Sequence, residues 1–406
     1  MKDDKKVPQL RFPEFTDAWK QRKLCEFVNF YSGLTYKPED VNQIGTFVLR
    51  SSNVKNGEIL DADNVYVNED IAKSEKVQLG DIIVVVRNGS RDLIGKHATV
   101  KRSMPNTVIG AFMTGIRAKE YSFVNALLDT NQFEKEINKN LGATINQITG
   151  YMFSNMSFTI PSEEEQHKIG SFFTQLDNTI TLQQRKLNSL QKLKKGLLQK
   201  MFPKNGENIP EIRFPEFSDA WKQRKLSDIA LIVGGGTPST NNPEYWDGEI
   251  DWYAPAEING QIYADYSARK ITKLGLEKSS AKILPAGKTV LFTSRAGIGK
   301  TAILRRPAAT NQGFQSLVLN DEIDAYFVYS MTEIIKQKAE KIASGSTFAE
   351  ISGKMLGGLS FMFPKYTEQN KIGTFFSKLD NLITLQQRKL EFLQKLKKGL
   401  LQQMFI

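Results

Sequence analysis

Apolar positions in residues 168–202 recur at steps of three and four, the spacing that places side chains on one face of an α-helix. Pro161 and a capping-box pair, Ser162 and Glu165, precede this stretch, and Pro203 follows it. We therefore predict one long amphipathic helix over residues 161–203. At about 1.5 Å per residue it would span roughly 60 Å, more than a body of this size can cover, so we expect it to pair with another helix.

The same pattern returns in residues 371–405, which match residues 168–202 at 28 of 35 positions. A second long helix is predicted over residues 366–406, although Lys365 replaces the serine of the capping box. Two helices with matched apolar stripes can lie antiparallel about a pseudo-twofold axis in a coiled-coil-like seam. Gly196 and Gly399 each cost about 1 kcal/mol in a helix interior, so we expect a close helix crossing there. The residues expected at this helix or partner interface are Phe172, Phe173, Leu176, Ile180, Leu187, Leu190, Phe375, Phe376, Leu379, Ile383, Leu390 and Leu393.

Between the repeated segments, turn-rich polar stretches alternate with short β-type runs such as those that begin at Gly80 and Lys288. This pattern predicts an α+β (mixed α/β) fold. The box RFPEFTDAWKQRKL from Arg11 also recurs, with one substitution, from Arg213. The expected organisation is a body over 1–160 with its box at 8–28, a helix over 161–203, a body over 204–365 with its box at 210–230, and a helix over 366–406. Repeated ends with unlike middles indicate that the ends perform one common task and that the two bodies between them perform different ones.

Composition narrows the class of protein. The longest apolar run, residues 82–86, is far shorter than the roughly 20 residues of a membrane span, and the start of the chain carries charges of both signs, so we expect a soluble protein without a leader peptide. One cysteine, Cys25, and two histidines, His97 and His167, cannot supply an internal disulfide or a cluster of soft metal ligands. The net charge of +11 favours a polyanionic partner.

Three enzyme-like motifs are incomplete. SRAGIGKT, which ends at Thr301, has Ser294 where a phosphate-binding loop needs glycine. NPEY from Asn242 has Glu244 in place of the second proline of the motif that holds a flipped base in amino-methyltransferases. Glu249 and Asp251 do not form the carboxylate cluster of a metal-dependent nuclease. We therefore predict no catalytic residue, no metal, no cofactor and no small-molecule substrate.

Binding chemistry remains, because Arg, Asn, Gln and Ser side chains on loops can pair with base edges or hold phosphates. Taken singly, each of these residues equally fits a loop hydrogen bond or a solvated charge. The basic run over residues 178–201 likewise fits either a solvated face or a contact with nucleic acid or an acidic partner. The candidate DNA-binding residues are Arg50, Ser52, Asn53, Arg87, Asn88, Arg91, Lys96 and Gln147 in the first body, and Ser294, Arg295, Lys300, Asn311, Gln312, Ser346 and Thr347 in the second.

Five stretches, in this order within a duplicated layout, carry a family resemblance over the whole chain. They are IPSEEEQHKIGSFFTQLD from Ile160, GGGTPSTNNPEYWDGEIDWYAPAEI from Gly234, LPAGKTVLFTSRAGIGKTAI from Leu284, ATNQGF from Ala309 and GSTFAEI from Gly345. With them the sequence resembles the specificity subunit of type I restriction-modification systems. In the first body, VVVRNGSRDLIGK adds about three residues to the tighter TSRAGIGK loop of the second.

The resemblance implies two similar target-recognition domains separated by two long antiparallel helices, each domain reading one half of a split, asymmetric site in double-stranded DNA. It also implies that the helices set the unread spacer and dock two methyltransferase subunits, which recruit translocating endonuclease subunits, in a bacterial or archaeal cytoplasm. Two other hypotheses stay open at this point. One is a self-contained enzyme that uses NPEY or GKT, and the other is a structural adaptor that bridges protein partners without DNA.

Overall fold

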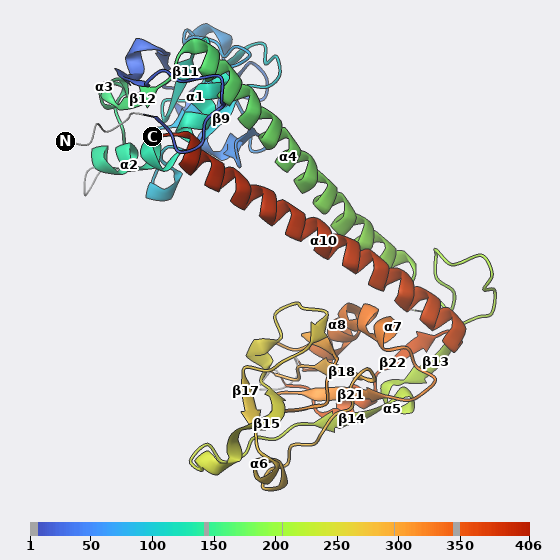
Figure 1. Ribbon diagram of the computed structural model, residues 1–406. Helices are drawn as coiled ribbons and strands as arrows, with labels where there is room; N and C mark the ends of the chain where they lie inside the picture. The colour runs from blue at the N-terminus through green and yellow to red at the C-terminus, as the bar shows by residue number, and fades with distance from the viewer. Residues whose placement is uncertain (1–6, 142–145, 205, 296, 344–349) are drawn as a thin grey trace. The chain divides into compact units, whose positions relative to one another are not determined.

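The computed structural model describes residues 7–141, 146–204, 206–295, 297–343 and 350–406, and Figure 1 shows their helices and strands. The chain forms two compact units: Met1–Arg185 with Arg388–Ile406, and Lys186–Gln387. Each unit therefore contains part of both long helices, α4 (Glu163–Lys200) and α10 (Tyr366–Met404). The sequence predicts a segment of its own for each helix, and in the structure each helix is divided between the two units. No helix in the described part of the chain is long and apolar enough to cross a membrane.

The described part of the first unit combines four small sheets, one of them the pair β5-β6, with three short α-helices. One sheet has the order β2-β11-β8-β9, another has the order β10-β4-β7-β3, and β1 pairs with β12. The strands of the two larger sheets are β2 (Asn29–Ser32), β3 (Val41–Asn42), β4 (Thr46–Leu49), β7 (Val65–Val67), β8 (Ile82–Val85), β9 (His97–Thr99), β10 (Thr107–Ile109) and β11 (Met113–Arg117). The remaining elements are β1 (Lys20–Lys23), β5 (Val54–Lys55), β6 (Glu58–Ile59), α1 (Tyr121–Leu128), α2 (Asn131–Asn140), α3 (Gly150–Asn155) and β12 (Ser157–Ile160).

The second unit repeats this plan. Its larger sheets have the orders β14-β21-β18-β19-β16 and β17-β15-β20, and β13 pairs with β22. The strands are β13 (Lys222–Lys225), β14 (Ala230–Gly234), β15 (Trp246–Tyr253), β16 (Tyr263–Ala264), β17 (Arg269–Ile271), β18 (Thr289–Phe292), β19 (Thr301–Leu304), β20 (Ala308–Thr310), β21 (Gln315–Leu319) and β22 (Ser360–Phe363). The short helices are α5 (Leu226–Ile229), α6 (Lys273–Glu277), α7 (Ala325–Ser330), α8 (Thr332–Ala343) and α9 (Gly353–Gly357). The mixed strand and helix content confirms the predicted α+β class.

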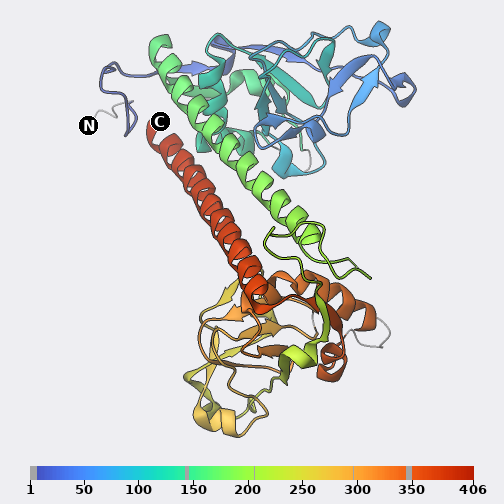
Figure 2. The same cartoon turned by 90° about the vertical axis from the view of Figure 1, so that its right-hand side faces the viewer.

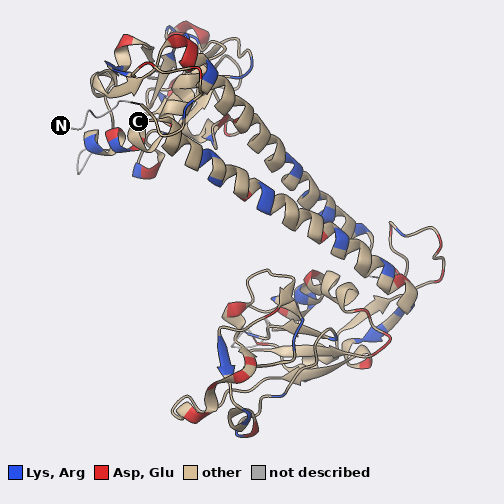
Figure 3. Ribbon diagram, in the orientation of Figure 1, with Lys and Arg blue, Asp and Glu red and all other residues tan. Residues whose placement is uncertain are grey.

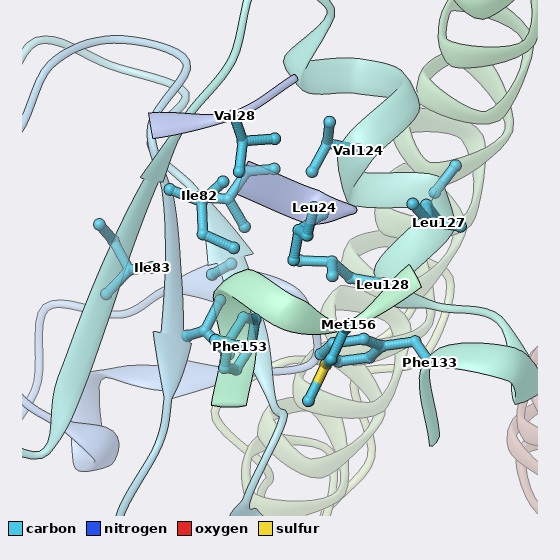
Figure 4. Close-up of a cluster of buried hydrophobic side chains, with 14 of the residues drawn as sticks. Leu24, Val28, Ile82, Ile83, Val124, Leu127, Leu128, Phe133, Phe153 and Met156 are labelled. Atoms are coloured by element: carbon cyan, nitrogen blue, oxygen red, sulfur yellow. The ribbon is translucent and has the colours of Figure 1, made fainter. Parts of the chain in front are cut away.

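Burial explains why the β-type runs form strands. All four side chains of β8 and all four of β18 are buried, as expected for strands covered on both faces. Figure 4 shows Ile82 and Ile83 of β8 in the first core, with Leu24 from the repeated box and Phe153 and Met156 from the α3 region. The repeated ends therefore contribute directly to the core of the body between them.

Both cores also include residues from the end of the long helix that belongs to the other repeat. In the first unit, the Phe405 ring stacks on Phe123 with centroids 5.5 Å apart and lies 6.1 Å from Phe173. In the second unit, the Phe202 ring lies 5.4 Å from Phe327 and 6.3 Å from Phe376. Figures 1 and 2 both show the C-terminal end of α10 beside the first part of α4. Each body is thus closed by a segment from the opposite half of the sequence.

Ion pairs within each unit show that the two long helices run antiparallel, as predicted. In the first unit, Lys397 Nζ contacts Asp177 Oδ1 at 2.5 Å and Asp129 Oδ2 at 2.6 Å. In the second unit, Lys194 Nζ contacts Asp380 Oδ1 at 2.5 Å. An early position on α4 thus meets a late position on α10 in the first unit, and a late position on α4 meets an early position on α10 in the second. Although burial alone would lower the pKa of Lys397, Asp129 and Asp177 raise it, so this lysine is a charged structural residue.

A buried carboxylate joins each repeated box to its long helix. The guanidinium of Arg11 donates to Glu165 through Nε and Nη2, both at 2.7 Å, and Trp19 Nε1 donates to Glu165 at 3.2 Å. In the second unit, Arg213 and Trp221 make the same contacts with Glu368, at 2.7, 2.7 and 3.3 Å. Two parallel N–H···O bonds to one carboxylate are the strong form of this interaction. The hydrogen bond that Arg11 donates to Glu165 raises the pKa of Arg11.

Two local predictions need correction. Ser162 Oγ accepts the backbone N–H of Glu165 at 3.4 Å, but the Glu165 carboxylate faces Arg11 and Trp19, so the capping box is incomplete. A Cβ built at Gly196 or Gly399 would meet no atom within 4 Å, so neither glycine marks a close helix crossing. The presence of a glutamate at this position in both repeats is therefore explained by its contacts with arginine and tryptophan side chains that are distant in sequence.

Replacing Glu165 or Glu368 with alanine should destabilise the corresponding unit by about 3 kcal/mol, because each change leaves a half-buried arginine and the N–H of a buried tryptophan without their acceptor. Urea unfolding followed by tryptophan fluorescence, in chains that keep only Trp19 or only Trp221 of the four tryptophans, would assign the loss to a unit. Glu163→Ala is the matched control, since its pair with Lys119 is exposed and should contribute about 0–1 kcal/mol. Equal losses for Glu163→Ala and Glu165→Ala would contradict this role.

Candidate nucleic-acid interface

In each unit, two parallel strands end at the same edge, and the loops that follow them meet there. β4 pairs in parallel with β10, and β15 pairs in parallel with β20. The N–H of Gly110 donates to Leu49 O at 2.8 Å, and that of Asn311 donates to Tyr253 O at 3.0 Å. The loop after β8 or β18 joins them, because the N–H of Val86 donates to Phe112 O and the N–H of Ser294 donates to Gly313 O. Equivalent backbone contacts therefore build the same platform twice.

We name these platforms the first and second loop surfaces. The first comprises residues 33–36, 50–53, 87–90, 110–112 and 146–149. The second comprises residues 235–240, 254–257, 294–295, 311–313 and 350–352. A glycine closes each surface: a Cβ at Gly33 would lie 2.0 Å from Gly110 O, and a Cβ at Gly235 would lie 2.0 Å from Asn311 O. Only glycine lets the segment after β2 or β14 lie directly on the neighbouring loop.

The first loop surface presents amide and guanidinium donors on a fixed backbone. Arg87 is exposed, and its guanidinium carbon lies 5.0 Å from the centre of the Phe112 ring. Asn88 Nδ2 donates to Ser51 Oγ at 3.1 Å, and Asn146 Nδ2 donates to Gly89 O at 3.1 Å. Gln147 forms a backbone bridge with Arg87. Arg87, Asn88 and Gln147 of the predicted set are thus brought together.

The second loop surface has different side chains on the same backbone. Gln312 is exposed and accepts a hydrogen bond from the Thr237 hydroxyl, and Asn311 Oδ1 accepts the N–H of Gly313 at 2.8 Å. Ser294 is fully buried, and its Oγ has no hydrogen-bond partner. Arg295, which follows it, is half-buried. Ser294 is the equivalent of Val86, because each donates its N–H to the carbonyl of Phe112 or Gly313 and accepts the N–H of Ile148 or Ile351. Arg295 is therefore the equivalent of Arg87.

Two of the predicted DNA contacts in the first body are engaged within the protein. Asn53 is fully buried: its Oδ1 accepts the N–H of Arg50 at 2.9 Å, and its Nδ2 donates to Ala62 O at 2.7 Å. The Arg50 guanidinium donates to the carbonyl and carboxylate of Asp63 at 2.6 and 2.8 Å. The prediction that Asn53 contacts DNA is withdrawn for this reason, and Arg50 supports its own loop. Glu257 has the role of Asn53 in the second unit, accepting the N–H of Ala254 at 2.8 Å.

The remaining candidates lie outside these central contacts. Ser52 and Lys96 both line an open cavity of about 600 Å³ beside α2. Arg91 belongs to the connection between β8 and β9, and Lys300 immediately precedes β19; both are exposed. Ser346 and Thr347 fall outside the described residues.

The enzyme-like motifs adopt local structures that differ from those of the enzymes. SRAGIGKT connects antiparallel strands β18 and β19, whereas a phosphate-binding loop joins a strand to a helix. Asn242 Oδ1 accepts the N–H of Glu244 at 3.1 Å, which makes NPEY a side-chain-capped turn. In the described part of the chain, no group of three His, Cys, Asp or Glu residues could hold a metal ion.

The chain itself uses most of the apolar residues predicted for the helix or partner interface. Phe172, Phe173 and Leu176 belong to the first core, Leu190, Phe375, Phe376, Leu379 and Ile383 belong to the second, and Ile180, Leu187, Leu390 and Leu393 are buried or half-buried. Exposed apolar side chains occur at other helix positions. Leu182 is 63% exposed and its repeat equivalent Leu385 is 62% exposed, and Leu193 and Leu396 form a second such pair. Leu182 could have been noticed in the sequence because it lies off the main apolar stripe.

Comparisons with known proteins agree with this duplicated architecture. The family model for the type I restriction modification DNA specificity domain matches residues 16–192 and 218–395. The putative type I restriction enzyme MjaX specificity subunit of Methanocaldococcus jannaschii is 25% identical over 96% of this chain and 93% of its own length. The MjaIX specificity subunit of the same organism is 36% identical, over 46% of this chain and 44% of that subunit.

A solved structure shows the same fold. The crystal structure of the type I restriction-modification system S subunit from M. genitalium has a TM-score of 0.65 at 14% identity, and the match covers 98% of this chain and 99% of that one. Since the family model matches both repeats, each with part of its box, its body and most of its helix, the chain belongs to the family of type I restriction-modification specificity subunits.

Proposed function

We propose that this chain is a non-catalytic DNA-recognition subunit in which each loop surface reads one half of a split, asymmetric site. The observation that carries the proposal is one platform built twice with unlike side chains. Equivalent backbone hydrogen bonds hold the turn Gly110, Ala111 and Phe112 in one unit and the turn Asn311, Gln312 and Gly313 in the other. A function that needed only a scaffold would not require different side chains at these equivalent positions.

The chemistry of the two surfaces suits base-edge recognition. Arginine pairs bidentately with guanine, and asparagine and glutamine pair with adenine. The first surface offers Arg87, Asn88 and Gln147, and the second offers Arg295, Asn311 and Gln312. Lysines and arginines also line both long helices (Figure 3), where exposed cations would attract DNA phosphates. Lys194 and Lys397 are exceptions, because carboxylates within the protein engage them.

We further propose that methyl transfer and cleavage belong to partner subunits. Leu182 and Leu385, together with Leu193 and Leu396, place exposed leucines at equivalent helix positions in the two repeats. Exposed apolar side chains on otherwise polar helices suit protein docking. Equivalent positions support two methyltransferase subunits, which in turn would recruit the translocating endonuclease subunits.

Genome-wide sequencing of methylated adenine tests the proposed function. A host with the methyltransferase partner should gain methylation at a two-part motif with a fixed gap only when this chain is present. Arg295→Ala should then relax one half of the motif by about 1–3 kcal/mol per lost base contact. Unchanged methylation, in cells where the two proteins co-purify, would instead support an adaptor that bridges protein partners without reading DNA.

Helix length gives a second test, because α4 and α10 each contribute to both units. Seven helix-forming residues inserted after Arg185 and after Arg388 add about 10 Å while nearly preserving the helical face. The gap between half-sites should lengthen by about three base pairs at 3.4 Å each, with both half-sites unchanged. A seven-residue insertion after Glu207, outside both helices, is the control and should leave the gap unaltered. An unchanged gap in the helix variant would refute the role of the helices as a ruler.

A further inference from the structure

Phe112 combines exposure with a fixed position on the first loop surface. It is 49% exposed in the short turn between β10 and β11. Its carbonyl accepts the N–H groups of Val86 and Arg87 at 3.0 and 3.2 Å, which ties this turn to the end of β8. A single exposed apolar side chain is ordinary on a protein surface. The groups around Phe112 indicate that this side chain contributes to binding.

Arg87 lies over the Phe112 ring, with its guanidinium carbon 5.0 Å from the ring centre. Its backbone is also held on both sides, by the Phe112 carbonyl and by the bridge to Gln147. The guanidinium makes no ion pair with any described residue. An arginine stacked on an aromatic ring keeps its N–H groups free for a planar acceptor and loses less side-chain freedom on binding. The pair is therefore arranged for a ligand that offers both a planar acceptor and an apolar group.

A guanine with a neighbouring thymine offers those two features in the major groove. Guanine presents the O6 and N7 acceptors that match arginine, and the thymine C5-methyl group is the apolar feature that phenylalanine can contact. The 5.0 Å between the guanidinium carbon and the ring centre is comparable to the rise of roughly 3.4 Å between adjacent base pairs. We propose that Arg87 and Phe112 act together, reading a guanine and the thymine methyl of an adjacent base pair in the half-site of the first unit. This inference rests on the proposed function.

The second unit keeps an arginine at this position but lacks the ring. Equivalent backbone contacts place Arg295 at the position of Arg87 and Gly313 at the position of Phe112. A Cβ at Gly313 would lie 2.6 Å from Pro255 Cγ, so no larger side chain fits there. The joint contact with a guanine and a thymine methyl group should therefore occur in only one half-site, and the other half-site provides an internal control.

The test uses the complex of the full chain with its methyltransferase partner, in three variants. Phe112→Ser removes the ring, Arg87→Gln removes the guanidinium, and Tyr121→Ser is the matched control. Tyr121 is also an exposed aromatic residue, at 41%, but it contacts Gly80 near the opposite end of β8. The affinity of each complex for the motif that it methylates is measured on two kinds of DNA. One is normal DNA, and in the other deoxyuridine replaces one thymine at a time, which removes only the methyl group.

At one thymine next to a guanine, the methyl group should strengthen binding of the original complex and the Tyr121→Ser complex by several-fold, but leave binding of the Phe112→Ser complex unchanged. Arg87→Gln should lower the preference for the neighbouring guanine by about tenfold or more, and the second half-site should stay the same in all complexes. The proposal is overturned if the original complex reads a two-part motif but no thymine methyl depends on Phe112. If the original complex reads no two-part motif, the proposed function itself fails, which is a distinguishable result.

Discussion

The fold depends on a buried carboxylate at the start of each long helix. Glu165 binds Arg11 and Trp19, and Glu368 binds Arg213 and Trp221, with nearly identical distances. A charge removed from water is tolerated only when it is fully paired, so each glutamate fixes the box and the helix in one arrangement. The body between the box and the helix then starts and ends on the same frame, which consists of that box and that helix. The backbone hydrogen bonds from Leu24 to Met156 and from Leu226 to Leu359 mark equivalent entry and exit points.

That frame is completed from the other half of the sequence. Phe405 fills the first core and Phe202 fills the second, so neither body buries its apolar side chains with its own repeat alone. The repeated segments must therefore stay alike, because each one packs both against the body of its own repeat and in the unit of the other repeat. The loops at the ends of the parallel strands carry no such double constraint. Phe112 can thus be replaced by Gly313, and Ala111 by Gln312, while the backbone contacts remain the same.

Sequence patterns predicted the parts of this architecture that repeat at short range. The long helices and the α+β bodies followed from apolar periodicity and from the duplication. The role of Glu165 did not, because Arg11 lies 154 positions away and a capping box explains the same local letters. Asn53 was misassigned for a similar reason, since a buried asparagine that holds a loop looks the same in sequence as an exposed one. Phe112 was missed because an apolar residue between β-type runs is normally read as core.

The loop surfaces show the same limit at the scale of single residues. Arg87 and Arg295 lie on equivalent loops, as the alignment of VVVRNGSRDLIGK with TSRAGIGK indicates, although the connection after β8 is longer. The contact of the Arg87 guanidinium with the Phe112 ring could not be predicted, because no short-range pattern shows which residues of two separate loops meet. Side chains that read a partner depend on such contacts, whereas helices follow from apolar periodicity.

Transplanting one body onto the other frame tests the central claim most directly. In a chain whose residues 226–359 are replaced by a second copy of residues 24–156, both boxes and both long helices keep their contacts. Methylated-adenine sequencing with the partner subunit should then give a motif in which the two half-sites have the same sequence and the original gap. A complex that assembles but still methylates the original asymmetric motif would contradict the claim that the bodies alone determine which half-sites are read.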